Sequence, residues 1–241
     1  MKSHLRFVLP SLLSGLSFAY YPFSGEDTGT VGKRFGFELE TDIAYFKYYD
    51  GSYQQDYIVQ ITSGLSRKAD IGIFIPYSRV GNGSKSEGLN DIGVFFKHVP
   101  YRKEISIGYR VQVNTDTGKR GIGYGKTTLN LNLMGEYSFG ANTLNLNLFY
   151  VNYGQVEGLR DSYGLSIGMF RNYRERLSYG AELTALQPED SGIETTDVHL
   201  ILGLVYHTSG GVDVSFGLHK TLTYDSSLSD YGVLVGSLIP F

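Results

Sequence analysis

From Arg34 to the C-terminus, apolar and polar residues alternate along the chain in one segment after another. The segment from Glu104 to Asn114 shows the pattern clearly, because Ile, Tyr and Val occupy its odd-numbered positions and Glu, Ser, Gly, Arg, Gln and Asn its even-numbered positions. Successive side chains of a β-strand point to opposite faces, so this period of two predicts strands with one apolar and one polar face. A chain with such a pattern can form a soluble barrel with an apolar interior or a membrane barrel with an apolar exterior.

Twelve strands follow from this periodicity. They span Arg34 to Tyr48, Asp56 to Ser66, Asp70 to Val80, Asn90 to His98, Glu104 to Asn114, Thr127 to Tyr137, Thr143 to Tyr153, Ser162 to Phe170, Leu177 to Leu186, Asp197 to His207, Val212 to Leu222 and Asp230 to Phe241. The connections alternate between long ones, such as Gly81 to Leu89 and Thr115 to Lys126, and short ones, such as Arg67 to Ala69. An even strand number with short turns at one end and long loops at the other is typical of outer-membrane barrels.

The glycines indicate which face points inward. Nearly all strand glycines share the polar phase with the charged residues, and only Gly135 lies on the aliphatic phase. Glycine belongs on the crowded, concave side of a curved sheet, so the polar phase lines the lumen and the aliphatic phase faces outward. A continuous apolar exterior is stable only in lipid. The sequence therefore predicts an all-β fold: a transmembrane antiparallel up-and-down β-barrel of about 12 strands.

The N-terminus has the form of an export signal. Lys2 and Arg6 precede an apolar run from Phe7 to Ala19, and Ser17 and Ala19 are the small residues that a signal peptidase reads. A buried N-terminal helix is the alternative. The expected organisation is a signal peptide over residues 1–19, a periplasmic N-terminal segment over 20–33 that could plug the barrel, and the barrel domain over 34–241.

Location and partners follow from this architecture. The chain ends on Phe241, and an aromatic terminus on an amphipathic last strand resembles the signal read by the barrel-assembly machinery. We therefore expect a bacterial outer-membrane protein that contacts outer-membrane lipid, the assembly machinery through Phe241, and a small-molecule solute. A formal charge of -3 lacks the basic excess of a general nucleic-acid binder, so no nucleic-acid partner is expected.

Three short segments are similar to a known family. Asp27 to Glu40 reads DTGTVGKRFGFELE, Gly88 to Lys97 reads GLNDIGVFFK, and Gly123 to Leu133 reads GYGKTTLNLNL. These resemble segments of the outer-membrane barrel family named for the meta-pathway of phenol degradation, although Lys97 is followed here by His98-Val99-Pro100 where the family commonly continues Lys-Tyr-Arg. The resemblance implies a transporter-like barrel with a presumed role in passing hydrophobic or aromatic compounds, without catalytic residues.

Charged residues on the inward phase form the candidate solute path. They lie near mid-height of their strands: Glu38, Glu40, Asp42, Arg110 and Glu182. An unpaired charge in a narrow barrel is costly, so we expect the acids and the base to pair. Twelve strands lie between the eight that their own side chains fill and the sixteen that enclose a water channel. The lumen is therefore either a narrow polar pore or a plug of ion pairs.

His199 and His219 form a candidate luminal pair. If the hairpin closes through Thr208 to Gly211, positions that sum to 418 oppose each other and these two histidines face one another. The pair could bind a divalent metal or change charge near pH 6.5, but two histidines without a third ligand favour simple pore lining. We therefore predict no metal, no cofactor and no catalytic residue.

Three functions fit these observations, and they are given in order of how well the sequence supports them. The first is a channel or transporter for small hydrophobic or aromatic compounds, which rests on the family resemblance. The second is a structural or surface-interaction barrel without transport, and the third is an outer-membrane lipid enzyme. Conductance separates the first two.

Overall fold

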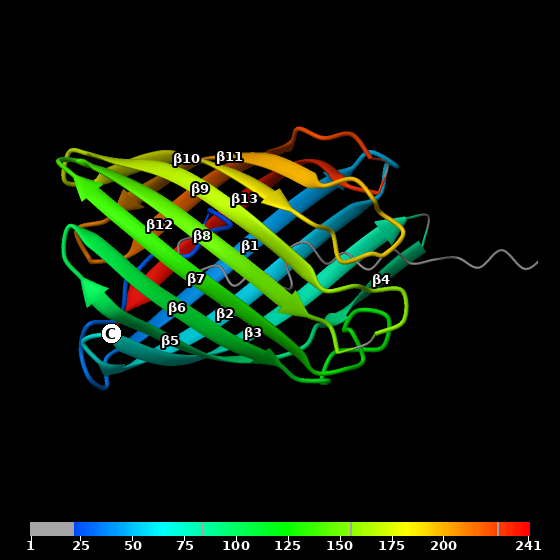
Figure 1. The fold of residues 1–241 in the computed structure, drawn as a ribbon, viewed down its shortest axis with the longest axis horizontal. Helices are drawn as coiled ribbons and strands as arrows, with labels where there is room; N and C mark the ends of the chain where they lie inside the picture. Colours follow the sequence, from blue (N-terminus) through cyan, green and yellow to red (C-terminus); the bar gives the residue numbers. More distant parts are fainter. Residues whose placement is uncertain (1–21, 83, 155, 226) are drawn as a thin grey trace, which may run out of the picture.

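The computed structural model describes residues 22–82, 84–154, 156–225 and 227–241, and these residues form a closed antiparallel β-barrel without helices (Figure 1). The predicted signal peptide lies outside the described residues. Within the described chain the strands are β1 (Phe37–Tyr48), β2 (Tyr53–Ser66), β3 (Ala69–Asn82), β4 (Ser84–Leu89), β5 (Gly93–Arg102), β6 (Ile105–Asn114), β7 (Thr128–Phe139), β8 (Asn142–Asn152), β9 (Ser162–Tyr173), β10 (Leu177–Leu186), β11 (Asp197–His207), β12 (Asp213–Thr221) and β13 (Ser229–Pro240).

The barrel closes between its first and last strands. β1 pairs with β2 on one side and with β13 on the other, and every pairing in the sheet is antiparallel. Neighbours in the barrel are neighbours in the chain, which is the up-and-down topology that the alternation predicts. β1 begins three residues later than predicted, because Phe35 adopts a φ of 61° and Gly36 closes a turn on Lys33.

The twelve-strand barrel contains thirteen strand segments because β4 and β5 share one position. The C-terminal half of β3, from Tyr77 to Asn82, pairs with β4, and its N-terminal half, from Ala69 to Phe74, pairs with β5. The segment Gly81 to Leu89, predicted as a loop, is therefore largely strand, since β4 extends the hairpin with β3. Its sequence has no apolar phase in Ser84 to Gly88, and the period-two signal could not detect it.

The two ends of the barrel differ. At the turn end, between two and five residues connect consecutive strands, and the C-terminus lies there (Figure 1). At the loop end, longer connections join β6 to β7, β8 to β9, β10 to β11 and β12 to β13, whereas β1 and β2 are joined by a short turn. Asp91 stabilises the β6–β7 loop by accepting hydrogen bonds from the main-chain N–H groups of Gly118 and Tyr124 at 2.8 and 2.7 Å.

The two faces of the wall are as predicted. Leu131 and Leu146 are 37% and 46% exposed on the outside, whereas their strand neighbours Asn130 and Asn145 are buried in the interior. Tyrosines such as Tyr101 and Tyr173 add exposed aromatic rings near the turn end. An apolar belt between aromatic side chains matches a lipid bilayer. Among the described residues, no helix is long and apolar enough to cross a membrane.

Candidate functional site: the barrel lumen

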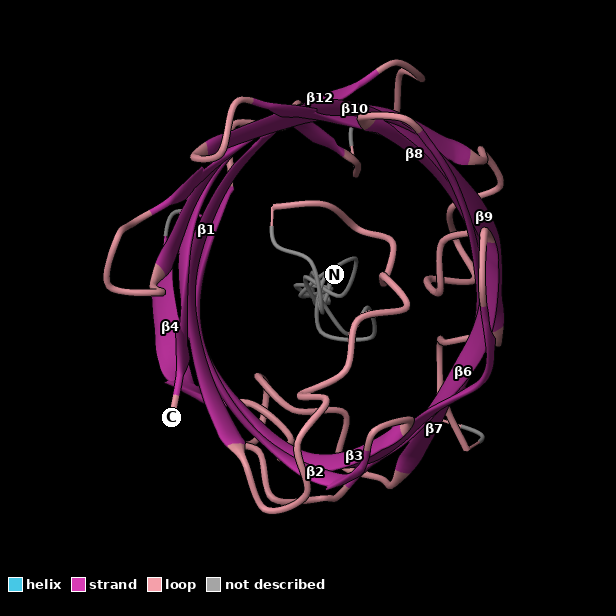
Figure 2. Cartoon of the chain, turned by 90° about the vertical axis from the view of Figure 1, so that its left-hand side faces the viewer, coloured by secondary structure: helices cyan, strands magenta, loops and turns pink. Residues whose placement is uncertain are grey.

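Residues 22–36, which we call the luminal segment, enter the barrel rather than lie below it: residues 22–28 are mostly buried in the lumen, whereas residues 32–35 are exposed at the turn end (Figure 2). The segment runs from the middle of the lumen to the turn end, where Gly36 leads into β1. At the turn end, Phe35 donates to the main chain of Gly64 in β2 and Gly36 accepts from it. Deeper in the lumen, the main-chain N–H groups of the segment need acceptors from wall side chains. The site is therefore defined by the wall side chains that accept hydrogen bonds from this segment.

Wall side chains accept hydrogen bonds from the main-chain N–H groups of the luminal segment. Glu182 accepts from Ser24 at 2.8 Å and from Gly25 at 3.0 Å, one N–H for each carboxylate oxygen. Asn147 accepts from Glu26 at 3.0 Å. Nearer the turn end, the same role falls to Glu136, which accepts from Thr28, and to Asp70, which accepts from Val31. Hydrogen bonds to carboxylates are stronger than neutral ones, so these contacts hold the segment firmly.

The main chain of Gly25 packs closely against the wall. A Cβ atom at this position would lie 2.5 Å from the Asn147 amide nitrogen and 2.7 Å from a carboxylate oxygen of Glu182. Only glycine allows the main chain to reach both side chains.

A buried ion pair occupies the centre of the lumen. Glu26 of the luminal segment and Arg110 of β6 approach to 2.7 Å, and both side chains are almost completely buried. Arg110 also donates to Gln60 at 3.0 Å and lies 3.6 Å above the Phe95 ring. Gln60 in turn donates to Glu40 at 2.8 Å, so the pair belongs to a network that spans the segment and three strands. Each charge has several partners, which is the condition for stable burial.

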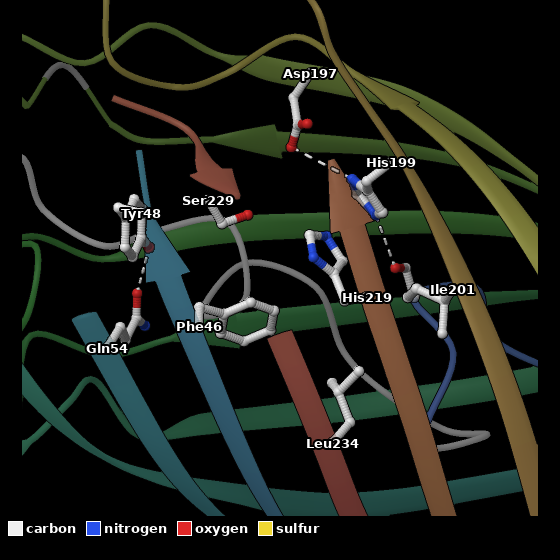
Figure 3. A pocket seen from close by; sticks show the side chains of 10 residues that line it. Phe46, Tyr48, Gln54, Asp197, His199, Ile201, His219, Ser229 and Leu234 are labelled. Atoms are coloured by element: carbon white, nitrogen blue, oxygen red, sulfur yellow. Dashed lines mark hydrogen bonds and ion pairs between the residues drawn. The ribbon is translucent and has the colours of Figure 1, made fainter. Parts of the chain in front are cut away.

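The luminal segment lies between two cavities. The cavity nearer the turn end, the inner cavity, is lined by Asp27, Thr30, Glu38, Asp70 and Lys97 among others, and Lys97 pairs with Asp27 at 3.1 Å. The cavity nearer the loop end, the outer cavity, is smaller and lies among the residues shown in Figure 3. Arg110 of the central ion pair lines the inner cavity, whereas neither residue of the pair lines the outer cavity.

The lumen also contains an apolar cluster around Phe23. The phenyl rings of Phe23 and Phe170 meet edge to face, with centroids 4.5 Å apart. The cluster lies on the inward phase of strands around the barrel: Ala44, Phe46, Ile58, Phe74, Phe149, Leu186, Ile201 and Leu234, with Tyr48 and Phe170 packed against it. The lumen is thus partly aromatic, whereas the sequence analysis predicted a polar interior.

The predicted charged residues are distributed over this site without pairing directly with one another. Arg110 pairs with Glu26 instead of Glu38, Asp42 or Glu182, and it reaches Glu40 only through Gln60. Glu38 lines the inner cavity. Among the described residues, neither carboxylate oxygen of Asp42 has a hydrogen-bond partner. The predicted pairing was therefore wrong in its partner, because the acid that neutralises Arg110 lies on the segment preceding the barrel.

The two histidines are close together, but in another register. Position sums between β11 and β12 are 420, so His199 opposes Thr221 and His219 opposes Ile201. The prediction that the two residues face each other directly was wrong by two residues, yet their rings remain 4.7 Å apart as diagonal neighbours (Figure 3). Among the described residues, no group of three or more His, Asp, Glu or Cys could hold a metal ion.

His199 joins the luminal segment to the wall. Its Nδ1 lies 3.3 Å from Asp197 (Figure 3). Its Nε2 lies 3.2 Å from the Ser24 hydroxyl. Although the order Asp, His, Ser resembles a hydrolase triad, the N–H groups of Ser24 and Gly25 already donate to Glu182. They are not free to bind an oxyanion, so this arrangement anchors Ser24.

Glu182, Arg110 and His199, which were predicted as luminal residues, contact the luminal segment, but other residues of these contacts were not predicted as site residues. Glu136 and Asn147 lie on the inward phase, and Phe23 and Glu26 lie in the segment that was predicted as a possible plug. The phase of Phe46, Phe74, Phe95 and Phe149 was already visible in the alternation and could have shown that aromatic rings enter the lumen.

Solved structures of similar fold are outer-membrane barrels. An outer-membrane channel from Pseudomonas putida has a TM-score of 0.73, with 10% sequence identity over 89% of this chain and 99% of that one. The CymD monoaromatic hydrocarbon channel has a TM-score of 0.55, with 9% identity over 88% and 90% of the two chains. The KdgM porin also has a TM-score of 0.55, with 12% identity over 85% and 99%. At such identities the likeness shows the fold alone.

Comparison of the sequence with protein families finds no matching family. Comparison with curated proteins finds no match either.

Proposed function

We propose that this protein is an outer-membrane channel for small hydrophobic or aromatic solutes, and that the luminal segment closes it at rest. The observation that carries the proposal is the position of this segment, which separates two cavities and is held by side chains around the wall. A purely structural barrel has no need of a segment placed between two cavities.

The proposed solute class rests on the lining of the lumen. Phe46, Phe74, Phe95, Phe149 and Phe170 all lie on the inward phase. Aromatic rings in the lumen give an apolar solute a surface that a purely polar pore lacks. The resemblance to the phenol-degradation family and the similar fold of CymD, a monoaromatic hydrocarbon channel, support the same class.

The proposed orientation places the turn end in the periplasm. Short turns face the periplasm and long loops face the exterior in barrels of this kind. Phe241 lies at the turn end and is 71% exposed, so it would be accessible to the assembly machinery on the periplasmic side. The apolar belt would contact the lipid of the outer membrane.

Single-channel current and solute flux in reconstituted bilayers test the proposal. Wild-type protein is expected to give rare, brief openings, and a variant that lacks residues 20–33 is expected to conduct continuously. A folded deletion variant that carries neither current nor an aromatic solute would refute the channel function.

The alternative is a structural barrel without transport. The number of contacts that hold the luminal segment favours this alternative, since Glu182, Asn147 and Arg110 would each contribute to a permanent seal. The alternative predicts that neither the wild type nor the deletion variant conducts, so the same recordings decide between the two functions.

A further inference from the structure

The side chain of Phe23 occupies a place in the lumen that fits a single aromatic ring. We propose that this place, defined by Phe170, Ile201, Gly203 and Leu234 and called the phenyl seat, is a binding site for monoaromatic solutes, which compete with Phe23 for it. The inference deepens the proposed function, because displacement of Phe23 by a solute is a step toward opening the lumen.

The phenyl seat encloses the ring completely. Phe23 is only 1% exposed, although it belongs to a segment outside the strands. Phe170 of β9 presents its ring edge to face at 4.5 Å, and Ile201 and Leu234 belong to the same buried cluster. Edge-to-face pairing favours aromatic rings over aliphatic groups of similar size.

The wall keeps space for the two rings by omitting side chains. A Cβ atom at Gly203 would overlap the Phe23 ring, and a Cβ atom at Gly180 would overlap the Phe170 ring. Glycine inside a strand weakens the strand and commonly marks a close approach of another group. The inward glycines of β10 and β11 thus create a cavity of aromatic shape, which the chain fills with its own phenyl group.

Phe23 acts in this geometry as a tethered ligand. The chain is anchored directly after it, since Ser24 and Gly25 donate to Glu182 and Glu26 pairs with Arg110. A short tether gives a ligand an effective concentration on the order of millimolar. A free solute must overcome this local competitor, so the apparent affinity of the wild type is lower than the intrinsic affinity of the seat.

The outer cavity gives a solute a route to the seat. Ile201 and Leu234, which belong to the seat, also line the outer cavity, and Ser24, the residue that follows Phe23, lines the outer cavity beside them. A solute that enters from the loop end therefore meets the phenyl seat before it meets the central ion pair.

Binding of fluorobenzene to the full mature chain in lipid nanodiscs, followed by fluorine NMR, tests the proposal. The variant Phe23→Ala vacates the seat without touching a strand and is expected to bind fluorobenzene at least tenfold more tightly than the wild type. The matched control is Phe216→Ala, because Phe216 is a phenylalanine on the lipid-facing side of β12. This control is expected to behave like the wild type and to report partitioning into lipid.

A double variant and a second probe make the test specific. Gly203→Leu in the Phe23→Ala background should fill the seat and abolish the added binding. Fluorocyclohexane should bind Phe23→Ala roughly two- to tenfold more weakly than fluorobenzene, because the aliphatic ring lacks the edge-to-face contact with Phe170. Equal fluorobenzene binding by Phe23→Ala and Phe216→Ala, or equal binding of the two probes by Phe23→Ala, would overturn the site.

The site and the channel can fail separately. Tight fluorobenzene binding by Phe23→Ala without conductance in the deletion variant would support the seat and refute the channel. Conductance without this binding would support the channel and refute the seat.

Discussion

The central ion pair determines how firmly the luminal segment is held, and Glu26→Gln tests this directly. Glu26 contacts Arg110 at 2.7 Å and Lys97 at 3.8 Å, and its side chain is completely buried. The substitution keeps the size of the side chain and removes only its charge. In the closed state Arg110 then stays buried without its acid, whereas in an open lumen water hydrates it.

The magnitude follows from the cost of an uncompensated buried charge. Removing one member of a buried ion pair costs about 3 to 5 kcal/mol. The lower figure applies here, because Arg110 keeps its hydrogen bonds to Gln60 and Gln112 and its position over Phe95. A loss of about 3 kcal/mol corresponds to a roughly hundredfold fall in the ratio of closed to open states.

Single-channel recording in planar bilayers measures that ratio as the open probability. The matched control is Glu87→Gln, which breaks an exposed ion pair with Arg79 at 2.6 Å near the loop end. Such surface pairs contribute less than about 1 kcal/mol, so the control should change the open probability by less than tenfold. If Glu26→Gln and Glu87→Gln had equal open probabilities, the ion pair would not be what holds the luminal segment in the closed state.

Three further predictions concern the wall, the pore and a loop. Leu131→Arg, on the outer face near the bilayer midplane, should destabilise the protein folded in lipid by about 2 to 4 kcal/mol, while inward Asn130→Gln should have a small effect; denaturant titration in liposomes measures both, and equal costs would contradict the assignment of the faces. In the variant without residues 20–33, Arg110→Ala should increase cation preference and Glu40→Gln should reduce it, because charges inside a narrow tube dominate ion selectivity; reversal potentials in a salt gradient measure this, and unchanged values would exclude these residues from the pore. In the loop between β10 and β11, burial raises the pKa of Glu189 from 4.5 to about 8. Because the folded state retains this proton while the unfolded carboxyl has lost it, loop stability should fall between pH 4.5 and 8 by up to about 1.4 kcal/mol per pH unit. Glu189→Gln should abolish that dependence in hydrogen exchange of residues 187–196, and an unchanged pH profile would contradict it.

The sequence by itself was sufficient for the architecture of the wall. Leu131 and Asn130 show why, since a strand sends alternate side chains to opposite faces whatever its partners are. One apolar face repeated over a whole chain requires lipid outside and a closed sheet, and both conclusions follow from local pattern alone. Glycine on the polar phase, as at Gly203, identified the concave side for an equally local reason.

Tertiary structure alone decided the register and the contents of the lumen. A slip of two residues leaves every side chain on its own face, so the alternation could not distinguish a position sum of 418 from the observed 420 that places His199 opposite Thr221. The alternation could not predict the partner of Arg110 either. Glu26 precedes Arg110 by 84 positions and reaches Arg110 only when the luminal segment folds into the barrel. Periodicity reports which face a residue occupies, whereas pairing across a lumen depends on where distant segments meet in space.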